Sequence, residues 1–392
     1  MAIPVKSVLS PTLPGSPFAT KPSSACHRSA AKHFVLCILL LVSAVSVAAQ
    51  QSLSLADADL RGQRIFQQSA VTGMVLVVVR NREVMVKTYG ETAPASGHNP
   101  DANSLIRLCS ISKVLTSDVL LKLVADGKVS LSDPLQRYAP RGKRVPQAAD
   151  GGSITLLDLA THTAGLPREV SSYPRKTPHF TFPDYTLRWT WLPKQKLIAS
   201  PGTAALYSNI GFDLLGDALA SATGKSYAQL LHERLLQPLD MWDTTLFPSS
   251  EQCSRLLQPT GDEGPCAATE ASGASGGVYS TGADMVKLLQ YLLQTPGAPA
   301  QPSAALAVEL DPQKLKSVDG LSHAGDPTGF GLAWIQLGDP ANGSVVMEKT
   351  GGGAGFETTS HSASTTKPAS SSPPPTAKAK PRSTSSTNPT TC

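Results

Sequence analysis

Apolar and polar positions divide the chain into a series of predicted elements. Residues 74–79 form an apolar run and residues 84–89 alternate, with Asn81-Arg82 between them, which predicts a β-hairpin. Apolar residues then recur at helical spacing from Ser110 to Ala125, and Gly127 ends this helix. Further helices are predicted at 156–160, 209–223, 226–236 and 283–293, with late strands at 331–337 and 344–349. Strands at both ends with helices between them indicate an α/β (α+β) fold. We expect an antiparallel sheet flanked by helices, its last strands paired with the first hairpin, beside a helical lobe.

Both ends of the chain differ from its middle. Residues 34–49 are an apolar run behind Arg28 and Lys32, which predicts a signal peptide cleaved after Ala49, with an uncleaved anchor as the alternative. From Thr358 to Cys392 there is no Val, Ile, Leu, Met, Phe, Trp or Tyr, which predicts disorder. The expected organisation is a leader at 1–49, a folded domain at 50–357 and a disordered Ser/Thr/Pro/Lys-rich tail at 358–392.

Composition argues against a nucleic-acid partner and against a metal. The chain carries 34 basic and 29 acidic residues, but its two ends hold basic residues and no acid, so the middle is slightly acidic. Its histidines are scattered, and we interpret His162 as a structural residue of its turn. No glycine loop opens a helix in the way that phosphate binding requires, and no cofactor is expected.

Four cysteines follow the predicted leader. Cys253 and Cys266 bracket a short loop that contains two glycines and a proline, and export from the cytoplasm favours a disulfide between them. Two free thiols are the alternative. Cys109 is expected to pack as a small apolar side chain.

Three short motifs in a fixed order carry the candidate chemistry: Ser110-Ile111-Ser112-Lys113, Tyr207-Ser208-Asn209 and Lys349-Thr350-Gly351. The first places a hydroxyl and an amine one helical turn apart, and a serine becomes a nucleophile only beside a base. In the second, the phenol can relay a proton and the amide can bind substrate. In the third, the lysine and threonine can hold a carboxylate, and the glycine lets a substrate backbone approach closely.

Each motif alone has a structural interpretation. Ser110 can simply cap a helix, Tyr207 can pack its ring while Asn209 caps a helix, and Lys349 can be a solvated residue at a strand end. Their occurrence together, in this order and on suitable elements, favours a serine hydrolase that interacts with penicillin.

Around these motifs the chain resembles the class C β-lactamase and serine D,D-peptidase family, and within it the D-alanyl-D-alanine carboxypeptidase/endopeptidase subgroup. The resemblance runs from about Gln63 to Glu357 and includes residues 89–92, 159–163, 205–218, 276–281 and 349–356. It implies a serine β-lactamase/penicillin-binding transpeptidase-like fold. The pair Cys253 and Cys266 also matches that subgroup.

The resemblance also implies roles for individual residues. Ser110 attacks the scissile carbonyl, while Lys113 and Tyr207 share the acid and base work, the first base being left open. The backbone N–H groups of Ser110 and Gly352 form the oxyanion hole. Substrate binding falls to four residues, namely Asn209, Lys349, Thr350 and Gly351. No cofactor or metal is implied.

The implied function is that of a periplasmic serine D,D-carboxypeptidase/endopeptidase. It would bind β-lactams, act on peptidoglycan stem peptides through an acyl-enzyme and allow weak β-lactamase activity. Peripheral association with the membrane and the oligomeric state are left open. A class C-like β-lactamase or an esterase is one alternative.

The other alternative is an inactive truncated protein or a non-catalytic penicillin-binding module. It arises because the family continues after the Lys-Thr-Gly strand with further strands and a C-terminal helix, whereas a polar tail follows here. We interpret that tail as the product of a frameshift near Thr358.

Overall fold

The computed structural model describes residues 54–170, 177–259, 264–294, 315–321, 325–339 and 344–364. The predicted leader and residues 365–392 of the predicted tail lie outside these ranges. The described helices are α1 (Leu55–Gln68), α2 (Ser112–Ala125), α3 (Leu156–Ala160), α4 (Tyr185–Trp191), α5 (Asn209–Thr223), α6 (Tyr227–Leu231), α7 (Ser250–Ser254) and α8 (Gly282–Gln294). The described strands are β1 (Gly73–Arg80), β2 (Glu83–Gly90), β3 (Leu105–Arg107), β4 (Ala205–Leu206), β5 (Tyr279–Thr281), β6 (Val318–Asp319), β7 (Gly329–Phe330), β8 (Ile335–Asp339), β9 (Ser344–Gly353) and β10 (Phe356–Ser364).

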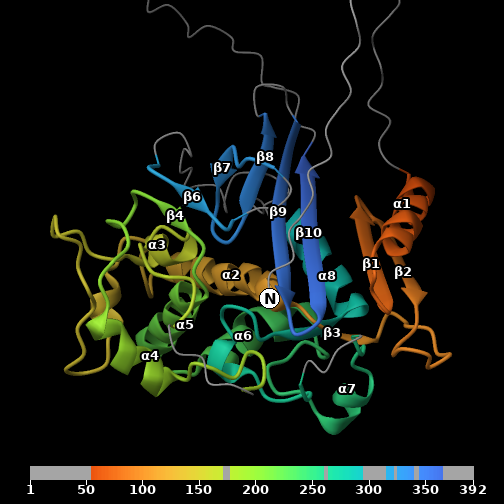
Figure 1. Cartoon of the computed structure of the whole chain (residues 1–392), viewed down its shortest axis with the longest axis horizontal. Helices are drawn as coiled ribbons and strands as arrows, with labels where there is room; N and C mark the ends of the chain where they lie inside the picture. Colours follow the sequence, from red (N-terminus) through yellow and green to blue (C-terminus); the bar gives the residue numbers. More distant parts are fainter. Residues whose placement is uncertain are drawn as a thin grey trace, which may run out of the picture. The chain divides into compact units, whose positions relative to one another are not determined.

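A four-stranded antiparallel sheet is built from the late strands, in the order β10-β9-β8-β7. In Figure 1 the blue strands β8, β9 and β10 lie side by side. Strands β9 and β10 pair along their whole length, from Gly353 opposite Phe356 to Val345 opposite Ser364. The lower ends of both strands contact the short 3-10 turn η1 (Cys109–Ile111) just before α2. This contact brings the sheet to the beginning of that helix.

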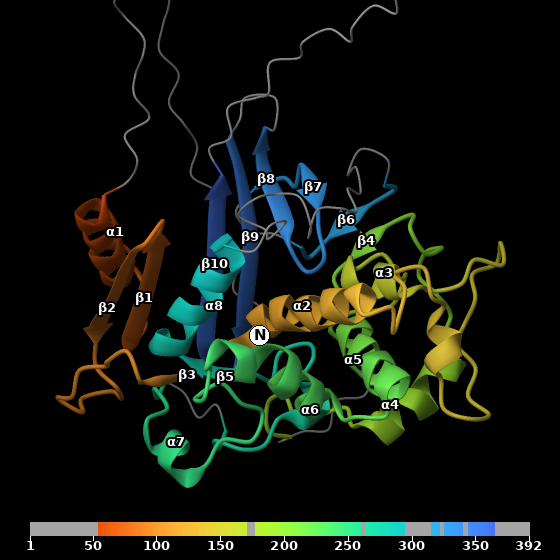
Figure 2. The same cartoon turned by 180° about the vertical axis from the view of Figure 1, so that it is seen from behind.

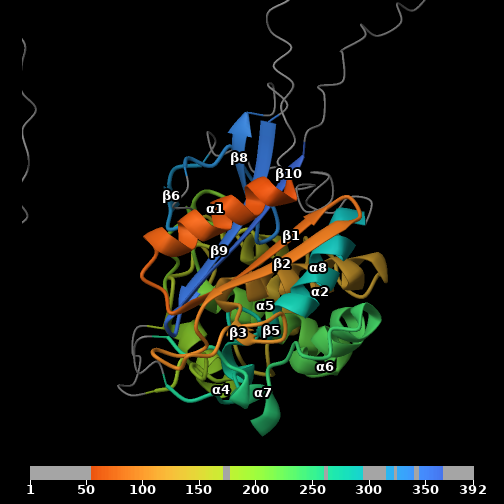
Figure 3. The ribbon, with the colours of Figure 1, turned by 90° about the vertical axis from the view of Figure 1, so that its right-hand side faces the viewer.

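The first hairpin forms as predicted, with β1 and β2 antiparallel around Asn81, whose φ of 54° suits a two-residue turn. Helix α1 lies alongside the two strands (Figure 3), where the Phe66 ring stacks on Tyr89 at 5.9 Å. Helix α8 packs against β1.

The prediction that the last strands pair with this hairpin is wrong for the residues that the structure describes. Strands β1 and β2 form a separate two-stranded sheet, and β10 pairs with β9 alone. Alternation along a strand indicates which face is buried, whereas the neighbour at its edge is chosen by backbone hydrogen bonds that leave no sequence pattern.

The helical lobe forms around α2 and α5. Their apolar faces join α3 and α6 in one buried cluster that includes Leu115, Leu120, Leu159, Leu215 and Leu231. Figure 2 shows α2 running from the foot of the sheet into this lobe. The lobe therefore holds the first turn of α2 rigidly beneath the sheet, and the predicted combination of an antiparallel sheet and a helical lobe is confirmed.

Several predicted boundaries differ from the structure. Residues 331–337 are not one strand, because Gly331 N–H bonds to the Trp334 carbonyl at 2.9 Å and turns β7 into β8. Strand β9 continues past Lys349 to Gly353, so the Lys-Thr-Gly motif lies within the strand instead of ending it.

The expected start of the tail at 358 is also corrected. Residues 358–364 extend β10, whose side chains are mostly Ser and Thr. The backbone hydrogen bonds that β10 makes with β9 along one edge form the strand here, without the large apolar side chains that the sequence prediction required.

Candidate active site

Ser110 lies in the η1 turn, one step before the helix it was expected to open. Cys109 has a φ of 50°, and α2 begins only at Ser112. The turn places Ser110 at the N-terminal end of α2, with 9% of its surface exposed. The partial positive charge of that helix end favours negative charge developing nearby.

Lys113 follows one turn later and is fully buried. Its Nζ donates to Ser110 Oγ at 3.3 Å, to Asn209 Oδ1 at 2.6 Å and to the Ser275 carbonyl at 2.5 Å. Burial lowers the pKa of Lys113, because the charged form loses its hydration, while the nearby carboxylate of Asp213 acts in the opposite direction. A lysine whose pKa is lowered in this way can be neutral near pH 7 and accept a proton.

Tyr207 reaches the same hydroxyl from the other side, and its Oη donates to Ser110 Oγ at 2.5 Å. The residue follows β4, whose parallel pairing with β6 continues through a bond from Tyr207 N–H to the Asp319 carbonyl at 3.1 Å. Ser208 then caps α5 by accepting from Gly211 N–H at 3.0 Å. The Ser110 hydroxyl therefore contacts both an amine and a phenol.

Positive charge gathers around the Tyr207 ring. Lys113 Nζ, Arg168 Cζ and Lys349 Nζ lie 4.9, 4.6 and 5.0 Å from its centre. Lys349 is buried, which lowers its pKa to about 8, and the cations of Lys113 and Arg168 contribute in the same direction. Below pH 8 the site presents cations to an anionic substrate group.

Asn209 is the first residue of α5 and joins two elements. Its Oδ1 accepts from Lys113, and its Nδ2 donates to the Glu169 carboxylate. The amide orientation is fixed by these two partners, because only the carbonyl oxygen can accept from the amine. Asn209 thus holds the Lys113 amine in place.

Strand β9 closely approaches residues 108–111 at Gly351; this turn carries the candidate nucleophile Ser110 and is called the nucleophile turn. A Cβ at this position would lie 2.8 Å from both Leu108 O and Ser110 N. At Gly352 a Cβ would meet nothing within 4 Å. The strand therefore touches the turn at one glycine and leaves open space at the next.

The structure brings the predicted residues together at this point: Ser110, Lys113, Tyr207 and Asn209 through hydrogen bonds, Lys349 through the Tyr207 ring, and Gly351 through close approach. Thr350 and Gly352 lie beside these residues because they are part of β9, where they pair with Thr359 and Glu357 of β10.

His162 lies directly behind Tyr207. Its Nδ1 accepts Ser208 N–H at 3.1 Å, and its ring stacks on Tyr207 at 4.5 Å. Burial lowers its pKa well below the ordinary value, and nearby cations act in the same direction. A neutral ring that holds this loop agrees with the structural role that the sequence suggested.

Four residues of the site were missed in the sequence: Arg168, Glu169, Asp213 and Ser275. Of these, only Asp213 carried a local signal, because it is an acid within the apolar stretch 210–215 on the same helix face as Asn209. Ser275 contributes a backbone carbonyl, and the other two reach the site through folding of the loop at 163–170, so their spacing from the motifs carried no information.

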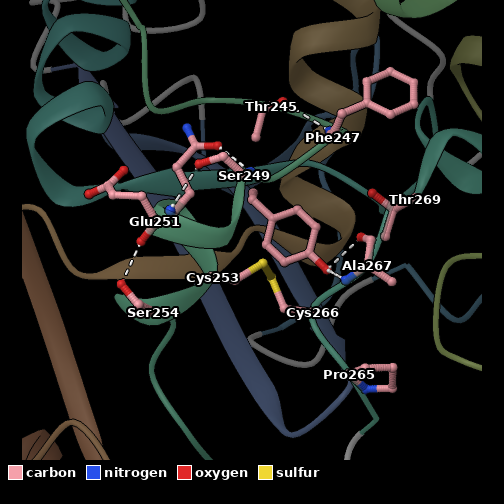
Figure 4. Close-up of a disulfide and its surroundings, with 12 residues drawn as sticks. Thr245, Phe247, Ser249, Glu251, Cys253, Ser254, Pro265, Cys266, Ala267 and Thr269 are labelled. Atoms are coloured by element: carbon pink, nitrogen blue, oxygen red, sulfur yellow. Dashed lines mark hydrogen bonds between the residues drawn. A yellow bond between two sulfur atoms is a disulfide. The ribbon is translucent and has the colours of Figure 1, made fainter.

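The structure joins Cys253 of α7 to Cys266 in a disulfide, with their Cα atoms 5.8 Å apart (Figure 4). Cys109 is buried, as expected of a packed side chain, and its burial raises its pKa to about 12.

No group of three or more His, Cys, Asp or Glu side chains in the described ranges could hold a metal ion. No helix in that part of the chain is long and apolar enough to cross a membrane.

Comparison with known proteins places this geometry in context. A family model described as Beta-lactamase matches residues 61–360. The chain is 41% identical over 302 residues to the D-alanyl-D-alanine-carboxypeptidase/endopeptidase AmpH of Escherichia coli (strain K12), covering 76% of this chain and 78% of that protein.

Solved structures give the same result. A β-lactamase/D-alanine carboxypeptidase from Yersinia pestis, complexed with citrate, superposes with a TM-score of 0.72 at 42% identity, over 79% of this chain and 89% of that one. A class C β-lactamase superposes with a TM-score of 0.59 at 22% identity, over 77% and 85%, which shows likeness of fold.

Proposed function

Because the chain belongs to the β-lactamase family and is a serine hydrolase, we propose that it acts as a D-alanyl-D-alanine carboxypeptidase/endopeptidase with Ser110 as its nucleophile. One observation carries the proposal: the Ser110 hydroxyl contacts both the Lys113 amine at 3.3 Å and the Tyr207 phenol at 2.5 Å. The substrate class comes from the relatives that share 41% and 42% of the sequence over most of their length.

The first step is acylation of Ser110. When Lys113 is neutral, its two N–H groups donate to the Asn209 and Ser275 oxygens, and its lone pair faces Ser110 Oγ in place of the donation that the ammonium makes. Since Tyr207 donates to Ser110 Oγ, the serine proton then points away from the phenol and toward this lone pair. As that proton moves to Lys113 Nζ, Oγ forms a bond to the carbonyl carbon of the scissile peptide. When the C–N bond breaks, the leaving amine takes the Tyr207 proton, and Lys113 returns its proton to the phenol. Water then hydrolyses the ester with the same groups in reverse.

The oxyanion of the tetrahedral intermediate is assigned to the backbone N–H groups of Ser110 and Gly352. The close approach of Gly351 to Ser110 N and the open space at Gly352 support this assignment. Each such donor typically contributes a factor of roughly 100–1,000 to the rate.

Substrate binding is assigned to Lys349, Thr350, Gly351 and Asn209. The buried Lys349 ammonium beside Arg168 forms a positively charged end of the site suited to a terminal carboxylate. The same arrangement would hold the carboxylate of a β-lactam. Weak β-lactam hydrolysis is therefore a second candidate activity, favoured by the similarity to the Yersinia pestis protein named for both activities.

We further propose that the chain works in the periplasm on peptidoglycan stem peptides. The Cys253–Cys266 disulfide supports this compartment, because such bonds persist where the surroundings are oxidising.

A fluorescent penicillin tests the proposal. The purified chain should acquire a covalent label, and the Ser110→Ala variant should acquire none although it folds. Release of D-alanine from muropeptides should exceed hydrolysis of a chromogenic cephalosporin. An unlabelled but folded wild-type chain would support the silent alternative, and faster cephalosporin hydrolysis would support a β-lactamase.

A further inference from the structure

Asp213 is a buried carboxylate that the proposed reaction does not use. It lies one turn after Asn209 in α5, and 4% of its surface is exposed. Its Oδ1 accepts the backbone N–H of Ser275 at 3.1 Å. Burying a carboxylate costs free energy of folding unless hydrogen bonds or a nearby opposite charge compensate for the lost hydration. The position of Asp213 beside the site therefore requires an explanation.

Ser275 connects this carboxylate to the lysine. The N–H of Ser275 is held by Asp213, and the carbonyl of the same residue accepts from Lys113 Nζ at 2.5 Å. Apart from Asp213, Ser275 itself makes only longer bonds, of 3.3 and 3.4 Å, to the Ser272 carbonyl, while its neighbours are held by shorter ones, including that from Thr116 Oγ1 to the Ala274 carbonyl at 2.7 Å. Asp213 therefore helps to fix the backbone group that receives the Lys113 amine.

The charges around this pair are few and lie on separate elements. Lys113 interacts electrostatically with Asp213 and with groups of the nucleophile turn, of the 162–170 loop and of β9: Cys109, His162, Arg168, Glu169 and Lys349. Asp213 interacts electrostatically with Lys113 and with one group on each of α4, α5 and α6, namely Arg188, Asp217 and Tyr227.

Arg188, the other cation near Asp213, makes its hydrogen bonds to Asp217 and to the backbone. Its Nη2 pairs with Asp217 Oδ1 at 2.7 Å, and its Nη1 donates to two backbone carbonyls. Trp189 Nε1 also donates to Asp217, at 3.0 Å. The Arg188 charge therefore acts on both Asp217 and Asp213, and Lys113 is the second cation that stabilises the Asp213 carboxylate.

We propose that Asp213 is a positioning residue for the Ser110–Lys113 pair: through Ser275 it orients the Lys113 amine, and its charge sets the pH at which that amine accepts the Ser110 proton. The inference rests on the proposed function, in which Lys113 is the base. Burial raises the pKa of Asp213 and lowers that of Lys113, and the attraction between the two groups opposes both changes.

The sign of the effect follows from Coulomb's law. A nearby negative charge stabilises the Lys113 ammonium, so that removing this charge lowers the pKa of the amine. The amine is then neutral at lower pH. In a plot of acylation rate against pH, the low-pH part, where the rate rises as Lys113 loses its proton, is called the acid limb, and it must move to lower pH.

The test is the rate of covalent labelling by fluorescent penicillin as a function of pH. Asp213→Asn keeps an oxygen that can accept Ser275 N–H and removes the charge. Its acid limb should move down by about one pH unit, which corresponds to roughly tenfold faster relative labelling on that limb. A merely structural role would change the rate at all pH values and leave the limb in place.

Asp284→Asn is the matched control. Asp284 is equally buried near the start of α8, where it accepts from Thr244 Oγ1 and Asp243 N–H at 2.9 Å and pairs with Lys287. Its loss should lower thermal stability and leave the acid limb unchanged.

Asp217→Asn provides a second test with the opposite sign. Removing that like charge favours the ionised form of Asp213, whose negative charge stabilises the Lys113 ammonium, so the acid limb should move to higher pH. An unchanged limb in either folded variant overturns the inference. Absence of any label on the wild-type Ser110 would instead overturn the proposed function, so that the two failures are distinguishable.

Discussion

At the scale of single residues, the candidate site was predictable where spacing along the chain determines contact. Ser110 and Lys113 meet because three residues of helical turn bring them together, and the sequence shows this directly. The carbonyl of Ser275 and the carboxylate of Asp213 meet Lys113 through tertiary packing. Contacts of that kind leave no local pattern, and backbone carbonyls carry no residue identity at all.

The buried Lys349 gives a prediction for pH. Its pKa is lowered to about 8, so the ammonium is present below pH 8 and is lost as the pH rises above it. The KM for a substrate with a free terminal carboxylate should then increase by about tenfold, the effect of losing one charged hydrogen bond. The same substrate with an amidated terminus should show no such increase, and an equal increase for both would contradict the role of Lys349.

Gly351 gives a prediction for packing. In Gly351→Ala the new methyl would press on Leu108 O and Ser110 N, which are backbone atoms that cannot move aside easily. The cost should be about 1–3 kcal/mol in thermal unfolding, with slower penicillin labelling. Gly352→Ala, whose methyl meets nothing within 4 Å, should unfold near the wild-type temperature.

At the scale of elements, apolar periodicity predicted α2, α3, α5, α6 and α8, and it missed α1, α4 and α7. Helix α5 spans Asn209–Thr223 as expected, between the Ser208 cap and Gly224 with a φ of 70°. Ser226 caps the next helix, α6, by accepting from Gln229 N–H at 3.2 Å. Strand β10 escaped prediction because its Ser and Thr residues contribute little apolar surface and its pairing depends on β9.

A substitution at Thr358 tests whether β10 forms in solution and stabilises the fold. The Thr358 Oγ1 donates at 2.8 Å to the carbonyl of Leu108, the first residue of the nucleophile turn. Thr358→Val should cost about 1 kcal/mol, measured by chemical denaturation, and slow the labelling of Ser110. Thr359→Val, at the neighbouring exposed position of the strand, is the control. Equal behaviour of both variants would favour the disordered tail over the strand.

At the scale of the whole molecule, the sequence predicted an antiparallel sheet beside a helical lobe, and it failed on the way in which the strands are distributed between sheets. The motifs come from three distant parts of the chain, and their order along it was sufficient to indicate the family. Which strand edges meet is decided by loop lengths and backbone hydrogen bonds, and apolar alternation does not report these.

The disulfide gives a prediction at this scale. Cys253 and Cys266 are 13 residues apart, and joining them restricts the unfolded chain. The double variant Cys253→Ser, Cys266→Ser should lose about 2–4 kcal/mol of stability. Reductant should lower the melting temperature of the wild type and leave that of the double variant unchanged. If reductant left the melting temperature of the wild type unchanged, the disulfide would contribute little to its stability.

The contact of Gly351 with the nucleophile turn has a practical consequence. On the proposed mechanism, Ser110 should react only when a loop, a helix and a sheet strand from three separate regions have all docked, so a chain with any of them detached should stay unlabelled. The amount of fluorescent penicillin bound should therefore be proportional to the amount of native protein. In a crude extract, the label would measure how much of the newly made protein has folded correctly.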